Sequence, residues 1–138
     1  MVTLKENSLD LETYLSLRAA VGWKKLSYEQ AKKALENSLY NVVAYAKDKP
    51  VAMGRIVGDG AVICYVQDLI VLPEYQKMKI GSMIMDKITA FVTDIKEENT
   101  EMMFCLMCAK GREKFYEGLG FTARPTENLG PGMIRYIK

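Results

Sequence analysis

The residues between positions 67 and 82 carry the clearest chemical signal in the chain. An apolar run ends at Pro73, and a short polar loop with Lys77, Lys79 and Gly81 leads into a helical pattern. The first N–H groups of a helix are unpaired and its dipole is positive there, so this position suits a phosphate or pyrophosphate. The pattern therefore indicates an anion site, although an ordinary connection with solvated lysines has the same composition. Neither GxxxxGK[ST] nor GxGxxG occurs here.

The absence of histidine narrows the remaining chemistry. It excludes Ser–His–Asp and Cys–His nucleophile pairs and a His-ligated zinc, so no metal is expected. Any proton transfer must use Asp, Glu, Tyr, Lys, Cys or water. The three cysteines, Cys64, Cys105 and Cys108, lie inside apolar runs. We interpret them as reduced, buried side chains rather than as a redox motif. Reduced cysteines are typical of the cytoplasm.

The overall composition sets the class of protein. A chain of 138 residues with 49% hydrophobic and 26% charged residues is expected to form one soluble domain, residues 1–138. The net charge of 19 − 17 = +2 is too small for a protein that binds nucleic-acid phosphates. The amino terminus lacks the apolar core of a signal peptide, and no apolar run approaches the ~18 residues of a membrane span.

Two segments resemble a known family. The sequence VLPEYQKMKIG at Val71–Gly81 is similar to motif A of the GCN5-related N-acetyltransferases (GNAT), whose core is [QR]-x-x-G-x-[GA]. Downstream, FYEGLGF at Phe115–Phe121 resembles the Y-x-x-x-G-F ending of that family. The order between them, a long helix, a strand and a short helix, also agrees. The resemblance covers about Tyr40–Phe121.

The chain departs from the family pattern at two positions. Lys79 stands where the family usually has glycine, and its ammonium would either crowd a pyrophosphate or pair with it; we favour pairing. Ala109 stands where many members carry an asparagine that touches the cofactor. The lack of that asparagine would weaken the affinity for the cofactor.

The resemblance implies that acetyl-CoA is the co-substrate. It would bind where the strand Tyr65–Leu72 splays from Met102–Cys108. Unpaired N–H groups at Leu69, Ile70 and Val71 would bind the pantetheine arm and polarise the thioester carbonyl. The backbone amides of one loop would hold the pyrophosphate: Gln76, Lys77, Met78, Lys79, Ile80, Gly81 and Ser82.

The resemblance also implies direct attack of an amine in a ternary complex. The substrate is expected to be a primary amine of a small molecule; the alternatives are a protein amine, or acyl-CoA sensing without turnover. Tyr116 matches the family's proton donor to the departing thiolate. The base that accepts the proton of the attacking amine is either Asp68 or a chain of water molecules. The neighbouring Gln67 stands where other members carry a glutamate, but glutamine cannot act as a base. Strand alternation places Gln67 and Asp68 on opposite faces.

The acceptor end of the cleft in this family is formed by the first two helices and the last hairpin. Trp23, Tyr28 and Met133 are therefore the candidate substrate-binding residues, and Trp23 has the alternative role of a core residue. The sequence itself does not indicate an oligomeric state, but homodimers are frequent in the family, so the resemblance allows a homodimer.

The elements that must position these residues follow from hydrophobic spacing and turn signals. The order of these elements predicts a mixed α+β fold with a mostly antiparallel sheet and flanking helices. The resemblance adds one splayed parallel strand pair. A capping box at Ser27–Gln30 marks the second helix. Helices are expected at Asn7–Leu17 (with Asn7 or Ser8 as N-cap), from Ser27 on, around Ile84–Ile95 and at Arg112–Glu117. Strands are expected at Val2–Lys5, Tyr40–Ala46, Val51–Val57, Ala61–Leu72, Glu101–Cys108, Phe121–Arg124 and Met133–Tyr136.

Overall fold

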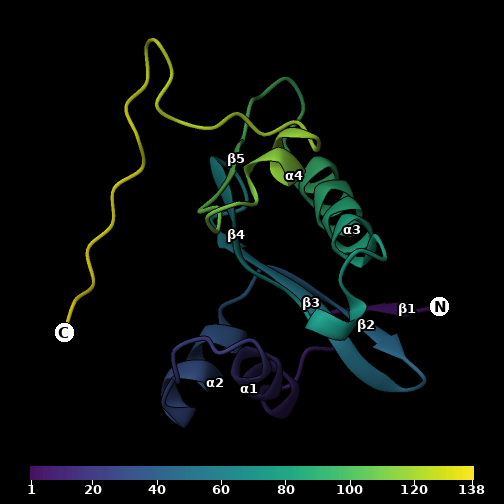
Figure 1. The fold of residues 1–138 in the computed structure, drawn as a ribbon. Coiled ribbons are helices and arrows are strands. Elements are labelled where there is room, and N and C mark those ends of the chain that lie inside the picture. The colour runs from purple at the N-terminus through teal and green to yellow at the C-terminus, as the bar shows by residue number, and fades with distance from the viewer. The chain divides into compact units, whose positions relative to one another are not determined.

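The computed structural model describes residues 1–138 and contains a five-stranded sheet in the order β1-β2-β3-β4-β5 (Figure 1). The first three pairings are antiparallel, and β5 runs parallel to β4. The strands are β1 Thr3–Glu6, β2 Tyr40–Ala46, β3 Lys49–Gly58, β4 Ile63–Val71 and β5 Met103–Leu106. The helices are α1 Leu11–Ala20, α2 Tyr28–Glu36, α3 Ile80–Ile95 and α4 Glu113–Glu117, with a 3₁₀ turn at Pro73–Tyr75. The expected α+β class is confirmed.

The chain divides into two compact units, Met1–Phe104 and Cys105–Lys138. The first unit holds β1 to β4 with α1 to α3, and the second holds α4 and the residues after it. No helix is both long enough and apolar enough to cross a membrane.

Helices cover both faces of the sheet in the first unit. Figure 1 shows α3 on one side of β3 and β4, and α1 and α2 on the other. Gly54 of β3 makes the close approach of α3 possible, because a Cβ there would lie 2.5 Å from Ile84 Cγ2 and 2.8 Å from Ile88 Cδ1. On the opposite face, Tyr14 of α1 and Ala31 of α2 are buried. The core therefore has two layers, one on each side of the sheet.

A β-bulge interrupts the register between β3 and β4. Arg55 pairs with Asp68 and Ile56 with Val66, so that Gln67 is the extra residue. Gln67 is exposed whereas Asp68 is buried, as strand alternation predicts. A bulge bends a strand and re-aims its side chains. The side chain of Asp68 lies beside Tyr14 and Arg18 of α1.

Side-chain caps fix the starts of α1 and α2. The capping box of Ser27 and Gln30 is present, as predicted. The first helix begins later than its apolar spacing indicated, because Asp10 rather than Asn7 or Ser8 is the N-cap and accepts a bond from the Thr13 N–H. Asn7 has a φ of 54° and belongs to the turn after β1.

The two strands expected at Phe121–Arg124 and Met133–Tyr136 are wrong. Residues 121–138 form no strand. Pro125 and Pro131 have no N–H for a strand ladder, and the hydrogen bonds within the segment are local: Arg124 Nε donates to Gly130 O over 2.6 Å, and Thr126 N to Leu129 O over 2.8 Å.

Candidate functional site

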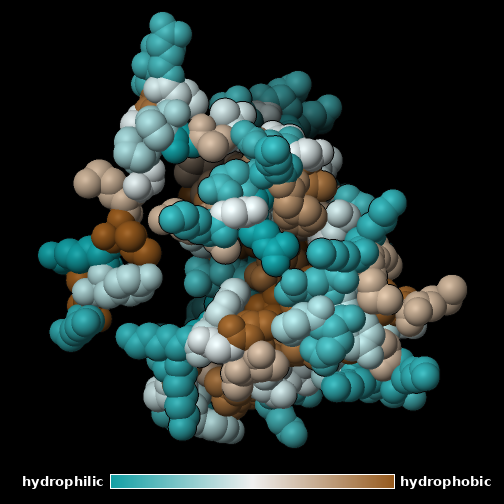
Figure 2. All heavy atoms as spheres, viewed as in Figure 1, coloured by the Kyte–Doolittle hydropathy of each residue, from teal (hydrophilic) through white to brown (hydrophobic).

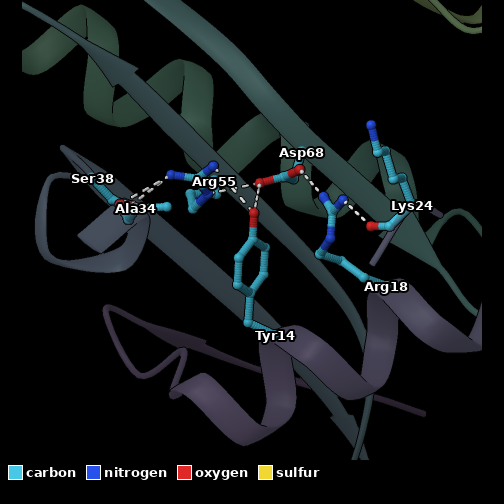
Figure 3. Close-up of polar contacts among 7 residues, drawn as sticks. All are labelled: Tyr14, Arg18, Lys24, Ala34, Ser38, Arg55 and Asp68. Carbon is cyan, nitrogen blue, oxygen red and sulfur yellow. Dashed lines mark hydrogen bonds and ion pairs between the residues drawn. The ribbon is translucent and has the colours of Figure 1, made fainter. Parts of the chain in front are cut away.

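A buried carboxylate lies between two arginines on the α1–α2 side of the sheet. The side chain of Asp68 is 1% exposed and accepts a hydrogen bond from Arg55 Nε over 2.7 Å. The Tyr14 hydroxyl donates to the same oxygen over 3.1 Å. Arg18 Nη1 lies 3.6 Å from the other oxygen. Figure 3 shows the two guanidinium groups on opposite sides of the carboxylate.

Arg55 joins four elements through one guanidinium group. Besides its bond to β4, its Nη1 donates to Ala34 O of α2 over 3.2 Å and to Ser38 Oγ over 3.0 Å. Its Nη2 donates to the Tyr14 hydroxyl of α1 over 3.2 Å. Burial, followed by the negative charge of Asp68, raises the pKa of Tyr14. The phenol therefore stays protonated and remains a donor to the carboxylate.

Arg18 attaches the segment between α1 and α2 to this cluster. Its Nη2 donates to Lys24 O over 2.7 Å (Figure 3). Its guanidinium carbon lies 5.4 Å from the centroid of the Trp23 ring and 5.6 Å from that of Tyr14, which are cation–π distances. Arg18 Nε and Asp68 Oδ1 are buried without a hydrogen-bond partner. Arg18 is therefore held in place by two aromatic rings, a carbonyl and a carboxylate.

A cavity of about 520 Å³ opens beside Arg18. Figure 2 shows apolar side chains among hydrophilic ones over the region of α1 and α2. The residues around the cavity come from the second half of α1 and from the segment that follows it: Leu15, Ser16, Arg18, Ala19, Trp23, Lys24, Lys25 and Leu26. Trp23 is 39% exposed, so the interpretation of it as a core residue is wrong.

The loop between β4 and α3 has a strained backbone and an open helix terminus. Lys77 and Lys79 have φ values of 65° and 64°, in the left-handed region that favours glycine. Lys79 is the N-cap of α3 and its side chain makes no capping bond, in contrast to Asp10 of α1 and Ser27 of α2. The first N–H groups of α3 therefore lack a side-chain acceptor. This conformation explains why glycine suits position 79.

Gln76 fixes that loop to the end of β4. Its Nε2 donates to Val71 O over 3.0 Å, so the side-chain amide supports the loop from within. Lys77, Met78 and Lys79 are exposed, whereas Ile80 is buried and anchors the start of α3. The residues of the expected pyrophosphate loop, 76–82, are thus brought together at one helix terminus.

The edge of β4 away from β3 is open over its second half. Leu72 N donates to Val51 O, so by antiparallel alternation the N–H groups of Leu69 and Val71 point away from β3. β5 has four residues against nine in β4 and begins beside Val62, where Met103 N donates to Val62 O. It is too short to pair with β4 as far as Leu69. Of the three expected strand donors, Ile70 points its N–H toward β3 instead.

Tyr116 lies in the second unit, at the end of α4. Its ring makes edge contacts with Phe115 and Phe121, at centroid distances of 4.9 and 6.0 Å. Burial is the main cause that raises the pKa of Tyr116, with a smaller contribution from Cys108. The phenol is therefore protonated at neutral pH.

The other expected substrate residues are not at the cavity. Tyr28 is the first residue of α2 and is 63% exposed, and Met133 lies in the irregular segment after α4 and is 91% exposed. Sequence reasoning did not assign Arg55 or Tyr14 to the site. The available signal for Arg55 was a charged residue in each of the two apolar strands joined by the Asp59–Gly60 turn. The turn alone does not pair the two residues, because Arg55 lies four residues before Asp59 and Asp68 lies eight residues after Gly60.

The comparisons with known proteins agree with this geometry. The model described as "Acetyltransferase (GNAT) domain" matches residues 37–123, so the chain belongs to the GNAT acetyltransferase family. A GNAT-family acetyltransferase structure from Streptococcus pneumoniae is 33% identical, with 100% of this chain and 99% of that chain covered and a TM-score of 0.84. A protein of unknown function from meticillin-resistant Staphylococcus aureus is 34% identical, with the same coverage and a TM-score of 0.84.

A curated relative from rice (Oryza sativa subsp. japonica) is named chloroplastic serotonin N-acetyltransferase 2. It is 27% identical over 138 residues, which are 97% of this chain and 67% of the relative. This chain therefore spans about two thirds of that relative's length.

Proposed function

We propose that this chain transfers the acetyl group of acetyl-CoA to a primary amine of a small molecule, by direct attack of the amine in a ternary complex. The observation that carries the proposal is the uncapped start of α3, which the loop 72–79 joins to the open edge of β4. The start of α3 suits a pyrophosphate, and the edge of β4 suits the amide and the thioester of the pantetheine arm.

The residues present fit acetyl-CoA. The amides of residues 76–82, with the ammonium of Lys79, would hold the pyrophosphate, and the N–H groups of Leu69 and Val71 would hold the pantetheine arm. Acetyl-CoA supplies an activated acyl group, so no covalent enzyme intermediate is needed. This assignment uses main-chain donors, which are fixed by the fold before the ligand arrives.

Two side chains were candidates for proton transfer. Tyr116 is the proton donor to the departing thiolate in this proposal, since its raised pKa keeps it protonated. Asp68 is better suited to a positioning role, because its carboxylate is 1% exposed and is engaged by Arg55, Tyr14 and Arg18. A water chain then accepts the proton of the attacking ammonium, since an alkyl amine of pKa about 10 is almost fully charged at pH 7.

The name of the rice relative supports an amine acceptor, because serotonin carries a primary amine. The three cysteines, Cys64, Cys105 and Cys108, are an odd number and lie in apolar runs of the sequence without the spacing of a disulfide framework, and on that ground we assign the cytoplasm. The rice relative, in contrast, is named chloroplastic. The location of this chain fused to a fluorescent protein would test the assignment to the cytoplasm.

The decisive experiment measures free thiol release from acetyl-CoA with a panel of small amines and of peptides with free amino termini or lysines. Amine-dependent release with small amines supports the proposal. Release with peptides alone would assign a protein acceptor. Binding of acetyl-CoA without release for any amine would assign acyl-CoA sensing and overturn catalysis.

A further inference from the structure

The cavity beside Arg18 combines positive charge with an apolar wall. Its charged lining residues are Arg18, Lys24 and Lys25, and no acidic residue lines it. Neither lysine makes an ion pair. The remaining wall is largely apolar, with Trp23 as its one aromatic group: Leu15, Ala19, Trp23 and Leu26.

The charge beside the cavity is not balanced by the buried cluster. Asp68 is the single carboxylate between Arg18 and Arg55, so the three groups together retain one positive charge. Arg18 Nε is also buried without a hydrogen-bond acceptor. The rest of the guanidinium has one carbonyl acceptor, Lys24 O, and shares the carboxylate of Asp68 with Arg55, so an anion in the cavity would add a charge-assisted partner. Lys24 and Lys25 add two exposed ammonium groups.

We infer that this cavity binds the acidic group of a small ligand with an apolar or aromatic body. The anion would lie among Arg18, Lys24 and Lys25, and the body against the Trp23 ring. If the proposed function holds, this ligand is the acceptor, an amine that carries a carboxylate or phosphate at its other end. Arg18 connects the cavity to Asp68 of β4, one residue before the open strand edge at Leu69.

The single tryptophan makes the cavity directly observable, since Trp23 is the only source of indole fluorescence. The probes are 3-phenylpropionate, its neutral isostere 3-phenylpropanamide, and 2-phenylethyl phosphate. We expect a saturable change in Trp23 fluorescence, with 3-phenylpropionate bound about five- to thirtyfold more tightly than the amide, since two exposed charge pairs contribute up to about 1 kcal/mol each. The ratio of the phosphate to the carboxylate affinity identifies which anion the site prefers.

Charge-matched variants locate the effect. Lys24→Gln with Lys25→Gln should reduce the preference for the acid to less than about threefold. Lys49→Gln with Lys87→Gln removes the same charge from exposed positions on β3 and α3 and should leave the preference unchanged. Equal affinities for the acid and the amide in the wild-type chain, or equal losses in both double variants, would overturn the inference.

A second measurement separates this inference from the proposed function. The affinity for acetyl-CoA, measured from the shift in melting temperature, should be the same in the wild type and in Lys24→Gln/Lys25→Gln. With acetyl-CoA present, 4-(2-aminoethyl)benzoate should have a lower KM than 2-phenylethylamine in the wild type only. A chain that binds the acidic probe but shows no such KM difference would overturn the acceptor assignment. A chain that does not bind acetyl-CoA would overturn the proposed function, while the fluorescence comparison still decides the anion site.

Discussion

Arg55 and Asp68 face each other across β3 and β4 as register partners, with Arg55 Nε 2.7 Å from Asp68 Oδ2. The two residues are 4% and 1% exposed, so the contact is shielded from water. A buried ion pair is not by itself a source of stability, because desolvation offsets much of the attraction. Its value here is geometric: the pair fixes α1 and α2 against the strand that we assign to the co-substrate.

Asp68→Asn should destabilise the fold by about 3–5 kcal/mol, because it leaves the buried Arg55 and the partly buried Arg18 without a counter-charge. Urea unfolding measures the change. Asp86→Asn, at an exposed position of α3, is the matched control and should be near neutral. If Asp68 were the catalytic base instead, the variant would keep wild-type stability and lose kcat.

The sequence was most informative where a local pattern determines local structure. The capping box at Ser27, the turn between β2 and β3 and the apolar spacing of α3 each depend on a few neighbouring residues. The strands expected near Phe121 and Met133 depended instead on pairing with a distant strand, which composition does not specify. Position 79 was the hardest to interpret, because a lysine there conceals the left-handed backbone that a glycine would have indicated.

The contacts of Asp68 could not be derived from the sequence for a related reason. They require the β3–β4 register, and the bulge at Gln67 shifts that register by one residue. They also require Tyr14 and Arg18 of α1, which lie 54 and 50 positions before Asp68 in the chain, to reach the same carboxylate. Only the tertiary structure brings these groups together.

Lys79→Gly should leave stability unchanged or raise it by up to about 1 kcal/mol, because a non-glycine residue in the left-handed region is strained by about 1–2 kcal/mol while glycine loses more chain entropy. Lys77→Gly, at a similar φ in the same loop, is the control for strain and should behave alike. Calorimetry with CoA then isolates the charge. Lys79→Glu should weaken CoA binding far more than Lys79→Gly, and equal effects of the two would mean that the ammonium is solvated.

Acetyl-CoA should stabilise the native chain by roughly 2.7 kcal/mol at one hundred times its Kd, because a ligand that binds only the native state shifts the unfolding equilibrium by mass action. Thermal unfolding at increasing concentrations measures this shift. Dephospho-CoA and pantetheine are the comparison ligands, and pantetheine, which lacks the pyrophosphate, should stabilise least. An unchanged melting temperature at millimolar acetyl-CoA would rule out the site.

Tyr116→Phe should lower kcat by about 10²–10⁴-fold, the usual contribution of a general acid, with little change in acetyl-CoA affinity. The raised pKa of Tyr116 sets the pH dependence. Because the phenol donates only while protonated, the wild-type rate should fall with rising pH only above about pH 10, the ordinary pKa of tyrosine. The variant should lack that decline. An unchanged kcat at saturating substrates would leave Tyr116 as a packing residue between Phe115 and Phe121.

Trp23→Leu separates a ligand surface from a structural contact. Trp23 is 39% exposed and lies 5.4 Å from the Arg18 guanidinium, so its loss removes a cation–π contact worth about 0.5–1 kcal/mol at an exposed site. The melting temperature should therefore fall by only a few degrees. The KM for the amine should rise about two- to thirtyfold, as expected for loss of an aromatic surface, while acetyl-CoA affinity stays constant. Tyr28→Leu is the matched control, since Tyr28 is exposed and does not line the cavity. A large loss of stability with an unchanged amine KM would place the acceptor elsewhere.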